Sequence, residues 1–582
     1  MKRSVTRILV IVGALSLGYG LLAALQHVGL LSDYHVQILV WVGINAIMGV
    51  SLNLINGFTG QFSLGHAGFM AIGAYVAAYC TKIWAMPFAV ALVFGGLAAA
   101  VGGLGVGIPT LRLSGDYLAI ATLGFGEIIR VAILNLDVVG GPRGLPGIPA
   151  HTSLLWVYCI VVLTVFVVKN LIWSKHGRAF VAIREDETAA ETMGIDTTSS
   201  KIAAFVIGAF FAGVAGGLYA HKITYIDPSQ FDFMKSVEAL LIVVLGGMGS
   251  LTGSVVASFI VTLLPELLRP LADWRMVVYA LLLILIMLYR PKGLMGASEF
   301  GLSSLGLGDD EPDPGRGSKR RPKEAELPPI IETRAVSASF GGLKAVSDLN
   351  MVVRSGEMTA LIGPNGAGKT TVFNMLTGLV GASEGHILYK GKSITNKRPS
   401  EINSMGIART FQNIRLFNNM TVIENVMIAL NGQHEYSMAE AVLRAGRYEQ
   451  AEEEIRARAM DLLRVFGLDD RAHEIASRLP YGDQRRLEIA RALATNPHIL
   501  LLDEPAAGMN PQETSELLDL IRWVRDKYEL TILLIEHDMK LVMNLCERII
   551  VLDHGMMIAD GPPSEVVRNR RVVEAYLGEE AV

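Results

Sequence analysis

The chain has 582 residues, so more than one domain is expected. Its mean hydropathy is +0.41 and only 18% of its residues are charged, which is low for a soluble protein. The net charge of −4, without a Lys/Arg stripe and interleaved aromatic residues, argues against a nucleic-acid partner. The cysteines Cys80, Cys159 and Cys546 are odd in number and far apart, so they support neither a disulfide framework nor a zinc site.

Residues 1–295 form the predicted membrane domain, an all-α domain that crosses the bilayer several times. A helix needs about 20 apolar residues to cross the hydrocarbon core. A signal peptide is the competing interpretation of the first apolar stretch, and the spans that follow directly argue against it. The candidate spans are 8–30, 36–56, 62–82, 87–108, 117–135, 153–172, 202–220 and 274–289.

The segment 237–268 is too long for one span and is interrupted by glycines at 246, 247 and 249. Basic residues near both ends of the membrane domain place both ends on the cytosolic side, which requires an even number of crossings. We therefore expect two short crossings that turn near the glycines, and about ten spans in total.

The same count places the polar segment 173–200 in the cytosol, where Ala179–Met193 is predicted to form one amphipathic helix. The segment is either a solvated connection or a docking surface for the rest of the chain, and its residues favour neither. Ionisable residues close to the predicted bilayer are expected to be interfacial or paired rather than part of a substrate path. They are His66, Asp116, Glu127, Arg130 and Glu238.

Residues 296–329 are rich in proline, glycine and charge, which predicts a flexible linker that could also contact membrane lipid headgroups. Residues 330–582 then have the composition of a soluble α/β domain. Its central motif, L-I-G-P-N-G-A-G-K-T-T, follows a buried apolar run and precedes a predicted helix, the context of a phosphate-binding loop. The predicted nucleotide-binding residues are Gly363, Pro364, Asn365, Gly366, Ala367, Gly368, Lys369, Thr370 and Thr371.

Two further apolar runs, at 498–502 and 531–535, are predicted strands that end in acidic residues. Asp503, at the tip of the first strand, suits Mg²⁺ together with the Thr370 hydroxyl. Glu504 can polarise the water that attacks the γ-phosphate of ATP. His537, after the second strand, could sense that phosphate.

In the membrane domain several motifs resemble the permease subunit of the branched-chain amino acid (LIV-type) ATP-binding cassette (ABC) importers. They are N-G-F-T-G-Q-F-S-L-G-H-A-G-F-M-A-I-G-A-Y (56–75), L-R-L-S-G-D-Y-L-A-I-A-T-L-G-F-G-E-I-I-R (111–130), G-G-P-R-G-L-P-G-I-P (140–149), R-E-D-E (184–187) and V-V-L-G-G-M-G-S (243–250). The resemblance implies that 175–195 couples the membrane domain to the ATPase. It also implies a second permease, a second ATPase and a periplasmic solute-binding protein as partners.

The second half resembles the ATPase subunit of the same importers, because L-P-Y-G-D-Q-R (479–485) stands where ABC proteins carry their signature. The resemblance implies that Phe340 stacks on adenine. It also implies that Gln412 senses nucleotide, takes part in Mg²⁺ binding and contacts the membrane domain. It assigns Mg²⁺ binding to Asp503, the general base to Glu504 and the switch histidine to His537. It also implies that the signature residues complete the partner's ATP site; they are Tyr481, Gly482, Asp483 and Gln484.

Pro480 stands where most ABC proteins have serine, and it offers neither a hydroxyl nor a backbone N–H. Asn510 stands where many have aspartate. We therefore expect this signature to complete the partner's site weakly, which would suit a heterodimer with two unequal ATP sites.

The expected function is ATP-driven import of branched-chain amino acids across the bacterial inner membrane by a fused permease and ATPase, with the ATPase in the cytoplasm. Urea or short amides are the nearest alternative solutes. An ABC exporter is disfavoured because the cytosolic loops are short, and a membrane-anchored regulatory ATPase is disfavoured because one span would suffice for it.

Overall fold

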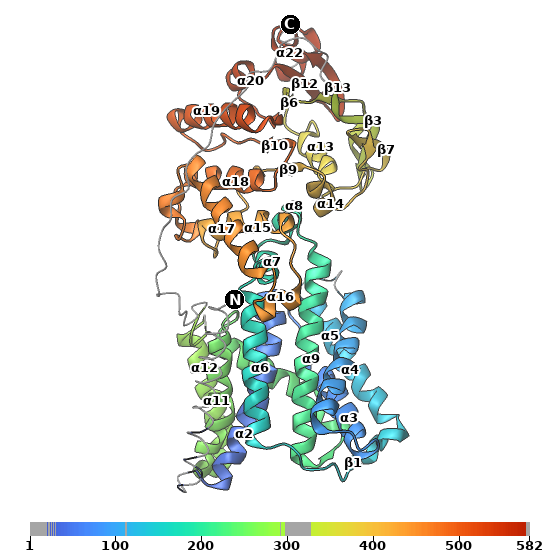
Figure 1. The fold of residues 1–582 in the computed structure, drawn as a ribbon. Coiled ribbons are helices and arrows are strands. Elements are labelled where there is room, and N and C mark those ends of the chain that lie inside the picture. The colour runs from blue at the N-terminus through green and yellow to red at the C-terminus, as the bar shows by residue number, and fades with distance from the viewer. Residues whose placement is uncertain are drawn as a thin grey trace. The chain divides into compact units, whose positions relative to one another are not determined.

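The computed structural model describes residues 31–110, 113, 115–291, 293–296 and 328–577, with isolated residues at 20, 24, 26 and 28. The chain divides into two compact units (Figure 1). The helical unit consists of Met1–Arg184, Thr197–Leu307 and Tyr436–Glu449. The sheet unit consists of Glu185–Asp196, Gly308–Glu435 and Gln450–Val582. The predicted span 8–30 and the predicted linker 296–329 lie almost entirely outside the described residues, and the predicted domain boundaries stay predictions.

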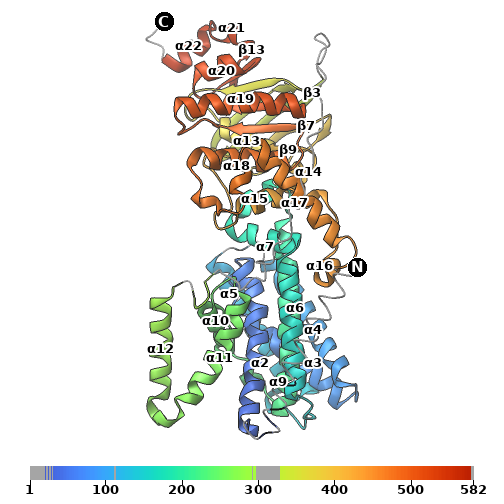
Figure 2. The same cartoon turned by 60° about the vertical axis from the view of Figure 1, so that its left-hand side comes forward.

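The helical unit is built from long apolar helices that run alongside one another (Figure 2). Every predicted span from 36–56 onward corresponds to one of these helices, and five of them are long and apolar enough to cross a membrane. The five are α2 with its π-helical extension (Asp33–Phe58), α4 (Phe88–Thr110), α5 (Asp116–Leu134), α6 (Leu154–Ile172) and α9 (Thr197–Ile223). The shorter apolar helices are α3 (His66–Lys82), α10 (Phe233–Gly246), α11 (Leu251–Leu267) and α12 (Arg275–Tyr289).

The segment 237–268 folds as two short helices, α10 and α11, which turn at the predicted glycines. Asn53 of α2 holds this turn, because its amide donates to the Ser250 carbonyl at 2.8 Å and its oxygen accepts from the Gly249 N–H at 2.9 Å. Asn53 therefore satisfies two polar backbone groups of the turn inside the protein, as an interrupted helix in a membrane requires.

Helices α3, α4 and α9 pack through small residues. A Cβ atom placed on Gly73 would lie 2.1 Å from the Gly213 carbonyl oxygen, and one on Gly95 would lie 2.8 Å from the Gly73 carbonyl oxygen. Such close backbone approach is typical of helices that associate inside a bilayer. By contrast, α4, α5 and α12 leave large apolar side chains exposed, among them Val101, Ile120 and Leu288.

Most of the ionisable residues flagged in the membrane domain are paired, as expected. His66 is fully buried and lies 2.9 Å from the Ser51 hydroxyl through Nε2. Glu127 and Arg130 form an ion pair within α5 at 2.8 Å. Glu238 accepts from Lys235 at 2.7 Å and from Asn45 at 3.0 Å.

The sequence predicted one helix over Ala179–Met193, and this prediction is wrong. The structure has two helices, α7 (Lys175–Glu185) and α8 (Glu187–Thr192), with a break at Asp186. Asp186 is extended, with φ −157°, and its carboxylate accepts from the Ala189 N–H at 3.0 Å. An aspartate that caps a new helix in this way ends the preceding one. The boundary between the two units falls at this break, between residues 184 and 185.

The sheet unit contains a six-stranded sheet in the order β13-β12-β6-β11-β10-β9. Its strands are β6 (Met358–Ile362), β9 (Ile407–Arg409), β10 (Ile499–Asp503), β11 (Thr531–Ile535), β12 (Arg548–Asp553) and β13 (Met556–Gly561). All neighbours are parallel except β12 and β13. Because β6, β10 and β11 are adjacent or next to adjacent and parallel, their carboxyl ends bring the motifs that follow them to one edge.

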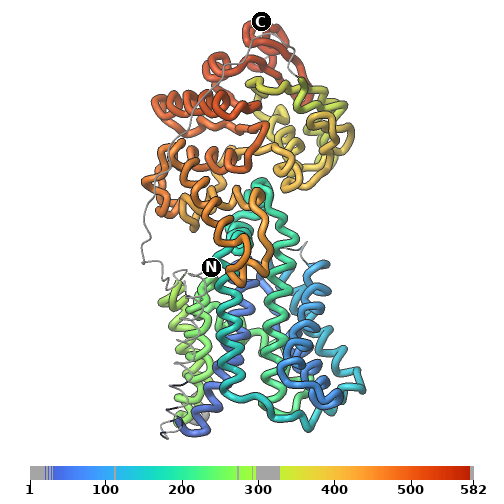
Figure 3. The backbone as a smooth tube through the Cα atoms, in the orientation of Figure 1, coloured from blue at the N-terminus to red at the C-terminus, as the bar shows by residue number. Residues whose placement is uncertain are grey.

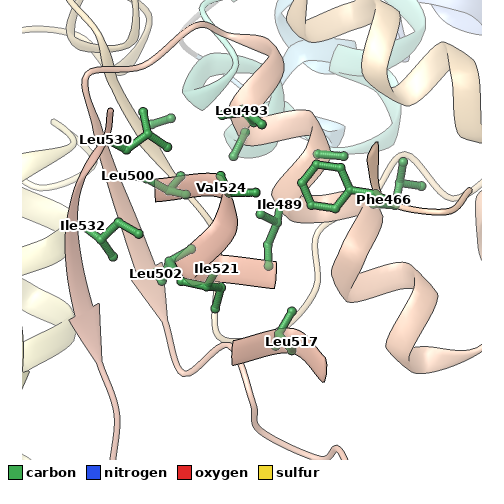
Figure 4. Close-up of a cluster of buried hydrophobic side chains, with 14 of the residues drawn as sticks. Phe466, Ile489, Leu493, Leu500, Leu502, Leu517, Ile521, Val524, Leu530 and Ile532 are labelled. Carbon is green, nitrogen blue, oxygen red and sulfur yellow. The ribbon is translucent and has the colours of Figure 1, made fainter. Parts of the chain in front are cut away.

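A second, antiparallel sheet contains β4 (Leu343–Leu349), β3 (Pro329–Phe340), β7 (Glu384–Tyr389) and β8 (Lys392–Ser393), with β5 (Val352–Arg354) paired to β3. Helices α18 (Tyr481–Ala494) and α19 (Pro511–Tyr528) cover the parallel sheet. Figure 4 shows the core between them, where side chains of α18, α19, β10 and β11 point toward one another. Ile489, Leu502 and Ile521 are at most 2% exposed. This core fixes the strand tips that carry the acidic motifs.

Candidate nucleotide site

The predicted phosphate loop lies between the buried strand β6 and helix α13 (Lys369–Leu376). Gly363, Gly366 and Gly368 have φ angles of 152°, 84° and 97°, a region that residues with a side chain rarely adopt. A Cβ atom on Gly368 would also lie 2.5 Å from the Ala345 carbonyl oxygen. Glycine is thus required at these positions by the backbone conformation and, at Gly368, by the lack of room for a Cβ atom. The loop curls at the start of a helix, where anions bind.

Lys369 closes this loop in the structure. Its ammonium donates to the carbonyl oxygens of Gly363 at 2.7 Å and Pro364 at 3.0 Å. Burial lowers the pKa of Lys369, although the carboxylates of Glu504 and Asp503 act against that shift. The lysine is therefore held next to the loop, where it can exchange carbonyl oxygens for phosphate oxygens.

Asp503, at the tip of β10, is 1% exposed and forms an ion pair with Arg409 at 2.9 Å. Burial raises the pKa of the Asp503 carboxyl, and the Arg409 guanidinium partly offsets this. Arg409 ends β9, is in register with Leu501 of β10, and also donates to Asn374 of α13 at 2.6 Å. No local sequence signal points to this role of Arg409, because its partner Asp503 comes from a strand almost a hundred residues away.

Glu504 lies next to two other predicted residues, Gln412 and His537. Its carboxylate accepts from the Gln412 amide at 3.0 Å and lies 3.7 Å from Nδ1 of His537. Its own backbone has a φ of 45°, and its N–H donates to the Ile535 carbonyl at 2.9 Å, which ties the tip of β10 to the tip of β11. A non-glycine residue with positive φ at such a tip is typical of a functional site.

The residues predicted to hold Mg²⁺ fit that ion by their chemistry. They offer a hydroxyl on Thr370, an amide oxygen on Gln412 and a carboxylate on Asp503, all oxygen donors of the kind that Mg²⁺ prefers. The Gln412 amide nitrogen donates to Glu504, which leaves the amide oxygen for another partner. The Arg409 bond engages Oδ2 of Asp503, which leaves Oδ1. These assignments stay predictions.

Phe340, predicted to stack on adenine, is the last residue of β3 and is 48% exposed. It pairs with Leu343 across the predicted Gly341–Gly342 turn. A ring on an exposed hairpin is free to receive a base. The loop residues Pro364–Ala367 also line a cavity of about 700 Å³, together with His554 and with Arg571 of the C-terminal helix α22 (Arg570–Leu577).

The signature residues lie at the start of α18 and make contacts of their own. The Tyr481 hydroxyl donates to the Ala507 carbonyl at 3.0 Å, Asp483 pairs with Arg471 at 3.0 Å, and Gln484 donates to the Leu479 carbonyl at 2.8 Å. Tyr481 is 45% exposed. Pro480 occupies the N-cap position of the helix without a side-chain cap, so the helix start offers one backbone donor fewer, as the sequence predicted.

A buried ion pair within α18 connects this helix to the site. Arg485 and Glu488 are at most 1% exposed and lie 2.7 Å apart. Arg485 donates to the backbone carbonyls of Gln412 at 3.0 Å and Glu504 at 3.1 Å. Glu488 accepts from the Phe411 N–H at 3.1 Å. This pair was not predicted from the sequence, although two opposite charges three residues apart on a helix are a recognisable signal.

The predicted coupling segment 175–195 is divided between the two units: residues up to Arg184 belong to the helical unit, and residues from Glu185 onward belong to the sheet unit. Asp186 pairs with Arg415 at 3.1 Å, and Glu185 accepts from the Asn419 amide at 2.9 and 3.1 Å. Met193 joins the main core of the sheet unit. The segment therefore packs against the loop that follows Gln412.

Comparison with known proteins matches both halves of the chain. The family model for the permease component of branched-chain amino acid transport systems matches residues 34–287. The model for ABC transporters matches 346–507, and that for branched-chain amino acid ATP-binding cassette transporters matches 556–582.

Among curated proteins, the second half is 47% identical over 251 residues to the high-affinity branched-chain amino acid transport ATP-binding protein LivG of Escherichia coli, covering 43% of this chain and 98% of LivG. The first half is 37% identical over 295 residues to the permease protein LivM of Salmonella typhimurium, covering 45% of this chain and 69% of LivM. The crystal structure of an ATP-binding cassette of an ABC transporter in its ADP conformation is 33% identical, with a TM-score of 0.38, covering 44% of this chain and all of that one.

Proposed function

Because the chain belongs to the branched-chain amino acid family of ABC transporters, we propose that it imports branched-chain amino acids as a permease fused to its own ATPase. Relatives named for the permease and for the ATP-binding protein of one transport system match separate halves of this one chain. The ATPase hydrolyses ATP to drive transport. The single observation that carries the proposal is this pairing of a matched permease half and a matched ATPase half.

In the proposed reaction, ATP binds with its phosphates on the loop 363–371 and its base on Phe340. Lys369 then exchanges its loop carbonyl partners for phosphate oxygens, and the bound Mg²⁺ would neutralise phosphate charge between Thr370, Gln412 and Asp503. Glu504 accepts the proton of the attacking water, and His537 and Gln412 orient that carboxylate from either side.

We further propose the following arrangement. About ten spans cross the inner membrane of a bacterium, with the sheet unit in the cytoplasm. A second permease completes the solute path, a second ATPase completes the ATP sites, and a periplasmic binding protein delivers the solute. The exposed apolar faces of α4, α5 and α12 suit lipid and a second permease. The Pro480 signature suits a partner ATPase that carries a fuller signature.

The test is uptake of radiolabelled leucine by cells that carry the complete transport system. Glu504→Gln is expected to lower uptake by about 10²–10⁴-fold, the contribution of a general base. Glu565→Gln, at an exposed glutamate of helix α21 (Pro563–Val566), is the matched control and should leave uptake unchanged. Excess isoleucine and valine should block uptake, whereas urea should not. Absence of leucine uptake in wild-type cells, with expression in the membrane verified, would overturn the proposed solute.

A further inference from the structure

The segment Tyr436–Glu449 comes from the ATPase half of the sequence but belongs to the helical unit. It contains the short helix α16 (Met438–Leu443), which Figures 1 and 3 show beside α6 and α7. We call this segment the hook. On either side of it the chain returns to the sheet unit, at Glu435 and at Gln450.

Contacts within the hook join its two ends and fix the start of its helix. Ser437 and Glu440 form a capping box at the start of α16, and Glu440 also accepts from the Arg447 N–H at 3.3 Å. The rings of Tyr436 and Tyr448, at its two ends, meet edge to face with centroids 5.4 Å apart. These local bonds give the segment a defined shape rather than that of a loose loop.

The hook binds the junction of α6 and α7 through hydrogen bonds and a cation–π contact. The Lys175 N–H donates to the Tyr436 hydroxyl at 2.6 Å, and the Lys175 ammonium lies 4.7 Å from the centre of the same ring. The Asn170 amide donates to the Val442 carbonyl at 2.7 Å. The Tyr448 hydroxyl donates to the Trp173 carbonyl at 3.3 Å.

Apolar contacts add to these hydrogen bonds. Met438 and Val442 of α16 pack against the main hydrophobic core of the helical unit. Tyr436 and Tyr448 are at most 8% exposed, and the ring of His176 meets that of Tyr436 edge to face at 5.8 Å. Buried aromatic anchors surrounded by polar contacts are the usual energetic centre of an interface.

We propose that the hook is a second transmission contact, by which the ATPase half moves the junction of α6 and α7. Helix α7 begins at this junction and ends at Glu185, where the chain enters the part of the predicted coupling segment that belongs to the sheet unit. One helix is thus bound near its start by the hook and continues at its end into a segment held by the sheet unit. This inference rests on the proposed function of ATP-driven transport.

The first test compares leucine uptake with ATP hydrolysis in full-length variants within the complete transport system. Tyr436→Ala should lower uptake at least fivefold while ATP hydrolysis stays within twofold, because hydrolysis continues but its motion is not transmitted. Tyr436→Phe, which keeps the ring contacts and loses one hydrogen bond, should keep at least half of the uptake. Leu443→Ala, in the same helix at a side chain that is 63% exposed, is the control and should stay within twofold. Unchanged uptake per ATP in Tyr436→Ala, or a parallel loss of both activities, would overturn the proposal.

The second test does not depend on leucine as the solute. Cysteines replace Asn170 and Val442, and a protease site is inserted between 296 and 329. After mild oxidation of membranes and cleavage, the two halves should migrate together on a denaturing gel and separate on reduction, with and without ATP. Cells with the oxidised pair should keep at least half of their uptake, since α16 and α6 move together. Halves that separate without reduction, or uptake abolished by the disulfide, would contradict a lasting attachment. If cells without the cysteine pair also take up no leucine while the cross-link still forms, the result counts against leucine as the solute and not against the hook.

Discussion

Arg415 donates to both carboxylate oxygens of Asp186, at 3.1 and 3.3 Å, within the sheet unit. Arg415 follows Gln412 by three residues, and Gln412 donates to the proposed general base Glu504. Its guanidinium also lies 5.1 Å from the centre of the Phe411 ring. A single short loop therefore contacts the hydrolytic carboxylate at one end and the coupling segment at the other, which suits a role in carrying motion between them.

The Arg415–Asp186 pair can be tested by charge reversal. Arg415→Glu would place two carboxylates together, and we expect uptake to fall about fivefold, since exposed ion pairs contribute up to about 1 kcal/mol. ATP hydrolysis should persist. The double variant with Asp186→Arg restores an opposite-charge pair and should recover most of the uptake. A double variant no better than Arg415→Glu would show that the pair does not carry coupling.

The Arg409–Asp503 pair makes a prediction about stability. Both side chains are 2% exposed, so Arg409→Met would leave a buried carboxylate without its partner. Breaking such a pair costs about 3–5 kcal/mol, which for a unit of this size corresponds to a fall in Tm of about 10 °C. Thermal unfolding of the full chain in detergent, followed through the sheet unit, measures this. Combining Arg409→Met with Asp503→Asn removes both charges and should recover part of the loss; no recovery would assign the effect to packing instead.

The local features of the site were predicted from local sequence patterns. The phosphate loop, the strands β10 and β11, and the hairpin at Phe340 were all predicted, because glycine spacing, apolar runs and turn residues are local signals. The turn between α10 and α11 was predicted from the glycines together with the even number of crossings. The helix break at residues 185–187 was not predicted. In a helical sequence pattern, an aspartate that caps a new helix cannot be told from an aspartate that faces solvent.

Long-range pairings could not be predicted in this way. Arg409 lies beside Asp503 only because β9 and β10 pair in this register. The hook is short and contains both apolar and polar residues, and nothing in its composition says that it packs with α6 rather than with the ATPase half that surrounds it in the sequence. Tertiary partners of this kind depend on the whole fold, so a single sequence does not specify them locally.

Cys546 makes a prediction about pH. Burial raises the pKa of its thiol to about 12 from an ordinary value near 9. At pH 8 the thiolate fraction is then about 10³-fold lower than that of a free cysteine, so alkylation should be slower by about that factor. Because the folded pKa is the higher one, the stability contribution is complete below about pH 9 and is lost between about pH 9 and 12.

Mass spectrometry after iodoacetamide treatment measures this labelling site by site. Free N-acetylcysteine is the comparison, and in denaturant Cys546 should be alkylated at the rate of this free thiol. Rapid labelling of Cys546 in the native protein would contradict its burial. In the Cys546→Ala variant, the part of the stability loss above pH 9 that arises from this thiol should disappear.

The small-residue packing of α3, α4 and α9 predicts which glycines the helical unit needs. Gly73→Ala would drive a methyl group to within 2.1 Å of a backbone oxygen on α9, and rigid backbone cannot yield as a side chain would. We expect loss of folded protein, measured as the monodisperse fraction in detergent by size-exclusion chromatography. Gly105→Ala, in α4 at a position with no atom within 4 Å of the new Cβ, is the matched control and should fold at least as well as wild type. If both variants fold equally, the close approach of α3 and α9 is not required; if both fail, glycine acts through helix flexibility rather than through packing.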